Sequence, residues 1–123
     1  MNKQLKYYTL FFIVVLASGC SINRQQALIQ DVKGTHPLDS NLIWLAHEHI
    51  LVDFIGADSI RPHSWNHDSI LKEVTPYLEE LKDYNVDYFV DATPNFLGRD
   101  VLLLEKIATK TGIRIITNTG LYG

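Results

Sequence analysis

The sequence predicts an α/β protein built on a parallel sheet. Apolar, strand-like runs at 42–49, 86–92 and 113–117 alternate with two amphipathic helical patterns, and the connections between them are short. Such strand–helix–strand units wind right-handed. A closed eight-stranded barrel takes around 250 residues, so the 123 residues present hold at most part of one. The alternation alone leaves an open sheet and a barrel equally possible.

The first helix is predicted over 68–84, after a strand at 42–49 that a turn at 37–40 introduces. Pro76 interrupts the helix, so we expect either a kink or a second helix with Thr75 as its N-cap. Asn85 tolerates the left-handed conformation that ends a helix. The apolar stripe, at spacings of three and four, consists of Leu71, Val74, Leu78 and Leu81.

The second helix is predicted over 100–110, between the β-branched and aromatic strand at 86–92 and the strand at 113–117. Gly112 is placed to end it. Its predicted apolar stripe consists of Val101, Leu104, Ile107 and Ala108.

The charge distribution argues against a nucleic-acid partner. The formal net charge is -3, and the basic residues are scattered among acidic ones. Phosphate backbones are bound by clustered lysines and arginines. The sequence contains one cysteine, so no disulfide can form within the chain.

The amino terminus has the pattern of an export signal: two lysines within 1–6, an apolar run at 9–17 and small residues before Cys20. The run is too short for a permanent membrane span, which needs about 20 residues. Residues 16–20 resemble the lipobox of bacterial lipoproteins, which implies lipidation of Cys20. An ordinary secretory signal with an incidental cysteine is the alternative.

We therefore expect a signal peptide over 1–19, a lipidated tether over 20–30 and the folded part over 31–123. The expected location is the bacterial cell envelope, with the lipid anchor in the outer membrane and the protein facing the periplasm. Ser21 after the cysteine does not resemble the aspartate signal for retention in the inner membrane.

The motif with metal-ligand character is His47-Glu48-His49 at the end of the first predicted strand. Successive side chains alternate faces along a strand, so both imidazoles project to one side. Neutral imidazole binds Zn²⁺, Mn²⁺, Co²⁺ or Fe²⁺. A pair hydrogen-bonded to the backbone at a strand end is the alternative.

Four segments, 46–50, 91–93, 98–100 and 119–122, resemble the phosphotriesterase-related family in order and spacing. The resemblance implies the N-terminal portion, about three β/α units, of a (β/α)8 TIM barrel of the amidohydrolase superfamily. It also implies two divalent metals, zinc above all, with His47 and His49 as ligands of the more buried one. A hydroxide bridging the two metals would hydrolyse a lactone, a carboxylic ester or a phosphotriester.

The family completes its site with a lysine, two histidines and an aspartate on strands beyond this sequence. We therefore expect a truncated chain that is inactive alone, unless a homodimer or a complementing C-terminal half supplies the rest. Two alternatives stay open: a non-catalytic lipoprotein that serves as a binding or structural module, and another amidohydrolase-type metal-dependent hydrolase.

Other residues have smaller expected roles. Tyr122 is placed where loops of the family line the substrate pocket, and an ordinary loop aromatic is the alternative. Asp91 is expected to order a loop. Arg99 and Asp100 are expected to organise a loop and a helix start. Residues predicted as surface histidines without a site are His36, His63 and His67.

Overall fold

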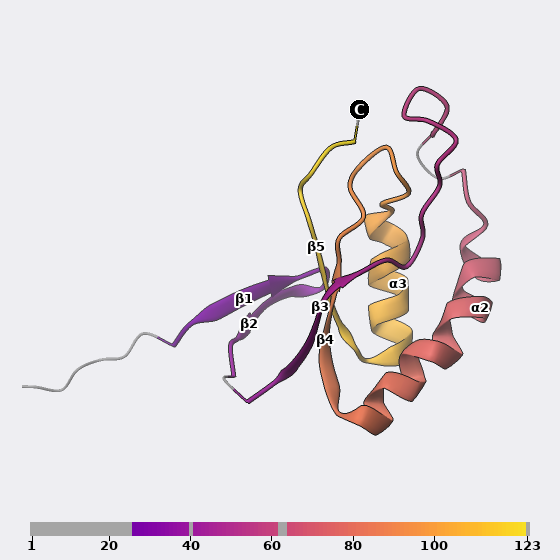
Figure 1. Cartoon of the computed structure of the whole chain (residues 1–123). Helices are drawn as coiled ribbons and strands as arrows, with labels where there is room; N and C mark the ends of the chain where they lie inside the picture. Colours follow the sequence, from indigo (N-terminus) through magenta and orange to yellow (C-terminus); the bar gives the residue numbers. More distant parts are fainter. Residues whose placement is uncertain (1–25, 40, 62–63, 123) are drawn as a thin grey trace, which may run out of the picture.

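A computed structural model describes residues 26–39, 41–61 and 64–122 (Figure 1). A hairpin precedes a three-stranded sheet whose strands alternate with helices. In Figure 1 the helices lie to one side of the strands and the hairpin to the other. The elements are β1 (Leu28–Asp31), β2 (Gly34–Pro37), β3 (Ile43–Glu48), α2 (His67–Glu80), η1 (Leu81–Tyr84), β4 (Val86–Asp91), α3 (Val101–Thr111) and β5 (Arg114–Thr117).

The sheet is parallel, in the order β3-β4-β5, which confirms the predicted α/β class. Its register aligns Leu45, Phe89 and Ile115 in one row across the three strands. This row packs against the helices, because Phe89 and Ile115 belong to the buried core and Leu45 packs on it. The helices supply Leu78, Leu103, Leu104, Ile107 and Ala108 to that core, and Ile113, just before β5, completes it.

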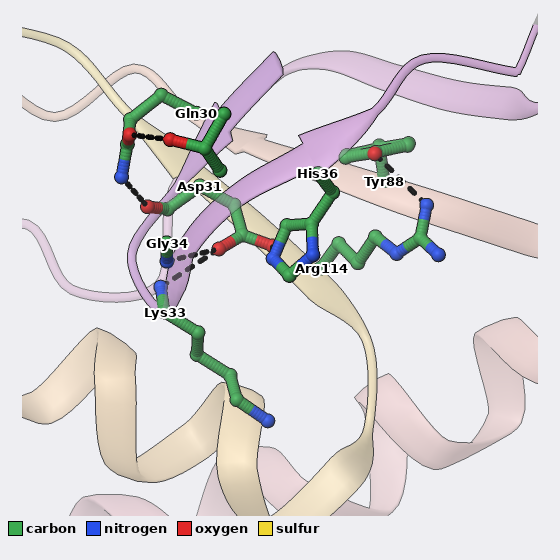
Figure 2. A network of polar contacts seen from close by, with 8 residues as sticks. Gln30, Asp31, Lys33, Gly34, His36, Tyr88 and Arg114 are labelled. Atoms are coloured by element: carbon green, nitrogen blue, oxygen red, sulfur yellow. Dashed lines mark hydrogen bonds and ion pairs between the residues drawn. The ribbon is translucent and has the colours of Figure 1, made fainter. Parts of the chain in front are cut away.

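A second row, Trp44, Tyr88 and Arg114, runs parallel to the first one residue earlier in each strand. The rings of Trp44 and Tyr88 are stacked, with centroids 4.2 Å apart. Arg114 places its guanidinium 5.2 Å from the centre of the Tyr88 ring and donates to the tyrosine hydroxyl at 2.9 Å (Figure 2). Alternating side chains project from opposite faces of a strand, so this row lies on the face away from the helices.

The hairpin of β1 and β2 was not predicted. Its turn forms because Oδ1 of the buried Asp31 accepts from the backbone nitrogens of Lys33 and Gly34, while Gly34 adopts a φ of 143° (Figure 2). Val32 then donates its backbone N–H to the carbonyl of Ile115 on β5. The first strand begins at Leu28, inside the segment 20–30 that we expected to be a tether.

Helix α2 is continuous through Pro76, so of the two alternatives expected there, a second helix capped by Thr75 is wrong. The hydroxyl of Thr75 donates instead to the carbonyl of Leu71 one turn earlier. Asn66 caps the helix by accepting from the backbone nitrogen of Ser69. The chain then leaves the short 3-10 helix η1 through Asn85 in the predicted left-handed conformation, with a φ of 58°.

Helix α3 begins and ends within one residue of the predicted bounds. The side chain of Asp100 accepts from the backbone nitrogen of Leu103, and Gly112 ends the helix with a φ of 76°. The predicted stripe is wrong at Val101, which is 46% exposed, while Leu103 is buried. The helix therefore lies on the sheet rotated slightly from the predicted face.

Within the described residues, no helix is long and apolar enough to cross a membrane. The predicted signal peptide and Cys20 lie outside the described residues.

Candidate metal centre

The two histidines of the motif meet at the carboxyl end of β3. His47 lies within the strand and His49 directly follows its last residue, Glu48. Their ring centroids are 5.3 Å apart and the rings stand at 71° to each other. Both side chains are exposed. The rings lie side by side, as strand alternation predicts, even though the pairing with β4 is irregular between Leu45 and Glu48.

Thr93 fixes the orientation of the His49 ring. The hydroxyl oxygen of Thr93 lies 2.9 Å from Nδ1 of His49, and Thr93 is completely buried. When Nδ1–H donates to this oxygen, Nε2 carries the free lone pair and is the nitrogen that could bind a cation. Hydrogen bonds of this kind from the second ring nitrogen orient metal-bound histidines in general. Thr93 was not assigned a role from the sequence.

Asp91 holds the strand ends that carry these residues. Its Oδ1 accepts from the backbone nitrogen of Thr93 at 2.8 Å, and its Oδ2 accepts from that of Ile50 at 3.1 Å. The residue is only 1% exposed. The backbone nitrogen of Ala92 adds a hydrogen bond of 2.8 Å to the carbonyl of Glu48. Asp91 therefore orders the loop, as predicted, and through Thr93 also supports His49.

The donor set fits part of a divalent metal site. Two neighbouring imidazoles at the carboxyl edge of a parallel sheet, one with its Nδ1 already engaged, suit zinc or a similar cation. Within the described residues, no group of three or more His, Cys, Asp and Glu side chains could hold a metal ion. Zinc sites use at least three protein ligands, so two imidazoles would supply only part of one.

Arg99 ties the loop before α3 to the loop after β5. Its Nη1 donates to the carbonyl of Asn118 at 2.6 Å and to that of Gly120 at 3.3 Å. The backbone nitrogen of Asn95 also donates to the carbonyl of Gly120. The predicted organising role of Arg99 is confirmed by these contacts.

Tyr122 lies in the loop after β5, beyond the carboxyl edge of the sheet. Its backbone nitrogen donates to the carbonyl of Asn95 at 2.9 Å, and the residue is 44% exposed. The ring is thus accessible to a ligand, and the expected substrate role stays a prediction.

Two histidines predicted as plain surface residues have acidic partners. His36 lies in β2, with its Nε2 3.0 Å from Oδ2 of Asp31. His67 is the first residue of α2, with its Nε2 2.8 Å from Oδ2 of Asp100. The surface prediction is wrong for His67, whose side chain is 15% exposed, whereas the side chain of His36 is 36% exposed. Hairpin pairing and helix packing bring in acidic partners that local sequence does not reveal. His63 lies outside the described residues.

A cavity of about 340 Å³ opens between the segment after β3 and the start of α3. Two arginines, Arg61 and Arg99, and two aromatic residues, Trp65 and Phe96, are among the residues that line it. Neither His47 nor His49 is among the lining residues, so the cavity is separate from the histidine pair.

Comparison with known proteins gives consistent results. The chain is 32% identical over 78 residues to the aryldialkylphosphatase of Saccharolobus solfataricus, an alignment that covers 63% of this chain and 25% of the relative. The organophosphorus hydrolase of Deinococcus radiodurans superposes with a TM-score of 0.67 at 27% identity, covering 84% of this chain and 31% of that one.

A third match is a structure from the engineering of organophosphate hydrolysis from a weak promiscuous lactonase template. It has a TM-score of 0.68 and 27% identity, and covers 77% of this chain and 30% of that one. The chain thus spans between a quarter and a third of these relatives. The superpositions confirm the predicted N-terminal portion of a TIM barrel.

The family model that matches is that of the phosphotriesterase family, and it covers residues 29–123. This match includes the histidine pair, the loops that Asp91 and Arg99 hold, and all three parallel strands. The chain belongs to the phosphotriesterase family.

Proposed function

We propose that this chain forms the first part of the metal site in a metal-dependent hydrolase of ester bonds. The observation that carries the proposal is the pair of adjacent imidazoles at the carboxyl edge of the sheet, with the ring of His49 held by the buried Thr93. Barrel enzymes place their active sites at this edge. Membership of the phosphotriesterase family supports the same reaction class.

In this proposal His47 and His49 hold one of two divalent cations, with zinc as the expected metal. Such cations, when bound, would supply a nucleophilic water near neutral pH and would polarise the carbonyl or phosphoryl oxygen of the substrate. The histidines supply neutral nitrogen ligands and transfer no proton. When Thr93 accepts from Nδ1–H of His49, Nε2 is left as the nitrogen that can bind a metal, and the contact orients the ring.

The substrate class is a lactone, a carboxylic ester or a phosphotriester. The relatives include an aryldialkylphosphatase and a structure engineered from a weak promiscuous lactonase template, which supports this range. Tyr122 is the residue of this chain that we expect to contact substrate, because its exposed ring follows β5 at the metal-site edge.

Two imidazoles alone hold a metal weakly, so we propose that the described residues are not active by themselves. The remaining ligands would come from sequence beyond this chain, from a complementing C-terminal half or from a second copy. The chain spans 25% of the aryldialkylphosphatase, which agrees with this proposal.

We also propose that Cys20 is lipidated and holds the protein at the bacterial outer membrane, facing the periplasm. The support is the basic, apolar and small-residue order of 1–20 in the sequence. Two or three acyl chains anchor a protein stably. Detergent phase partitioning of the native protein and of Cys20→Ser tests this: the native form should enter the detergent phase and the variant the aqueous phase. Equal partitioning would contradict lipidation.

The metal site is tested by titrating Co²⁺ into the full chain and following the visible absorbance of the bound ion. His47→Ala and His49→Ala should each abolish saturable binding. His36→Gln, which removes a histidine from the hairpin, should leave it unchanged. Binding that survives both site substitutions would overturn the proposed ligands.

Catalysis is tested with a lactone, an aryl ester, a phosphotriester and a phosphodiester, using the chain with and without a complementing C-terminal half of a family member. Metal-dependent turnover that appears on complementation and disappears in His47→Ala supports the hydrolase. Metal binding without turnover in any combination would favour the non-catalytic module. Turnover of a phosphodiester alone would favour another amidohydrolase-type reaction.

A further inference from the structure

Away from the histidine pair, three side chains form a hydrogen-bonded chain between α2 and α3. Nε2 of His67 lies 2.8 Å from Oδ2 of Asp100, and Nζ of Lys106 lies 3.1 Å from Nδ1 of the same imidazole. The side chains of His67 and Asp100 are 15% and 4% exposed. Lys106 is exposed to solvent. The carboxylate of Asp100 and the imidazole of His67 are thus largely shielded from solvent, whereas the amine of Lys106 is accessible.

The direction of each hydrogen bond follows from the groups themselves. A lysine ammonium has only donors, so Nζ of Lys106 donates to Nδ1 of His67. An ionised carboxylate only accepts, so Nε2–H of His67 donates to Asp100. In this arrangement the imidazole carries its proton on Nε2, and Nδ1 faces the lysine amine.

We propose that Lys106 is a nucleophilic amine that reacts with activated carboxylic esters, with His67 as its base and Asp100 as the positioning residue. The arrangement meets the geometric criteria for an activated nucleophile: nucleophile and base lie within hydrogen-bonding reach, and a third group orients the base. The shielded carboxylate also stabilises the imidazolium that forms when His67 takes a proton. The product is an Nε-acylated lysine.

The reaction balances with the ester as the only co-reactant. The Lys106 ammonium gives one proton to Nδ1 of His67, which passes it to water. The free amine attacks the ester carbonyl carbon, so a C–N bond forms and the acyl C–O bond breaks. The second proton of the nitrogen passes through His67 to the departing alkoxide. The products are an amide, an alcohol and one proton in solution.

Lys110 provides a matched control within the same molecule. It lies one turn later on α3 and is also exposed. Among the described residues, it makes no hydrogen bond or ion pair with an imidazole. Both lysines therefore lie on the same helix and are exposed to solvent, but of the two only Lys106 contacts His67.

The experiment treats the full chain with p-nitrophenyl acetate in EDTA and measures acetylation of each lysine by peptide mass spectrometry over time. EDTA separates the result from the proposed metal-dependent hydrolysis. Lys106 should be acetylated about tenfold faster than Lys110 or more, because general-base assistance contributes at least this much. Equal or slower acetylation of Lys106 in the native chain would overturn the proposal.

Two substitutions then separate base assistance from simple accessibility. His67→Gln should lower the Lys106 rate to that of Lys110 without changing Lys110. Asp100→Asn keeps a side chain that can cap α3, but it turns an amide N–H toward His67 and so favours the wrong tautomer. This variant should therefore also lower the acetylation rate of Lys106 to that of Lys110. If Lys106 is still acetylated faster than Lys110 in either folded variant, the proposed role of the substituted residue in activating Lys106 is overturned.

Discussion

Nδ1 of His49 lies 2.9 Å from the hydroxyl oxygen of Thr93, which stands 44 positions later in the chain. The contact exists because β3 and β4 pair in parallel, so that both strands end at the same edge of the sheet. Asp91 completes it by holding the backbone of Thr93 and of Ile50. The orientation of a proposed metal ligand thus depends on the neighbouring strand.

Thr93→Val should weaken metal binding while leaving the fold intact. Valine has the same shape but no hydroxyl, so Nδ1 of His49 loses its partner and its ring loses its fixed orientation. Loss of such a partner costs about 10-fold to 100-fold in metal affinity. Competition of a chromophoric chelator for Co²⁺ measures the change.

Thr93→Ser is the control, because it keeps the hydroxyl and removes one methyl group. Nitrogen NMR of the metal-free chain gives an independent measurement: His49 should carry its proton on Nδ1 in the native chain and in Thr93→Ser. Equal metal affinity in Thr93→Val and Thr93→Ser would contradict the orienting role of the hydroxyl.

Asp91→Asn should destabilise the fold by about 1–3 kcal/mol, the cost of leaving a buried polar group without its partner. The carboxylate accepts from two backbone nitrogens, whereas an amide offers one oxygen and directs its NH2 at the other donor. Urea unfolding measures the change. Asp87→Asn is the matched control, because its exposed hydrogen bond to the nitrogen of Ile43 can be kept by an amide oxygen. Equal losses in the two variants would contradict this account.

Gly98→Ala should destabilise the chain more than Gly56→Ala. Both glycines have positive φ, at 132° and 102°, so both substitutions strain the backbone. At Gly98 a Cβ would also lie 2.7 Å from the carbonyl oxygen of Leu51, whereas at Gly56 it would meet nothing within 4 Å. The added clash should cost about 1–3 kcal/mol beyond the Gly56 variant. Urea unfolding of the two variants side by side tests the ranking, and equal stability would exclude a rigid contact at Gly98.

Local chemistry made much of the fold predictable. Asn85, Asp100 and Gly112 end or begin helices through their own side chains or their own backbone freedom, and all three act as expected. The hairpin was missed because its strands are four residues each and its packing on β5 is a long-range contact. Its one local signal was Asp31 followed three residues later by Gly34.

The candidate site, like the fold, could be predicted from the sequence only in part. The meeting of the His47 and His49 rings follows from alternation along a single strand, and the structure shows it. The role of Thr93 depends on the register between β3 and β4, which the sequence does not determine. The contact of His67 was not predicted for the same reason, because its partner Asp100 lies at the start of a different helix, α3.

Arg99→Lys should loosen the loop that carries Tyr122 without unfolding the chain. One guanidinium nitrogen of Arg99 donates to the carbonyls of Asn118 and Gly120, and a lysine ammonium is a compact charge that does not reproduce this planar group. Hydrogen exchange should therefore speed up at the Tyr122 amide, which is bonded to Asn95, while the amide of Ile115 in β5 serves as the internal reference. Because the loop lies at the same edge of the sheet as the histidine pair, we also expect the variant to raise KM more than it lowers kcat if the complemented chain is active. Unchanged exchange at Tyr122 would show that the Asn95 contacts hold the loop without Arg99.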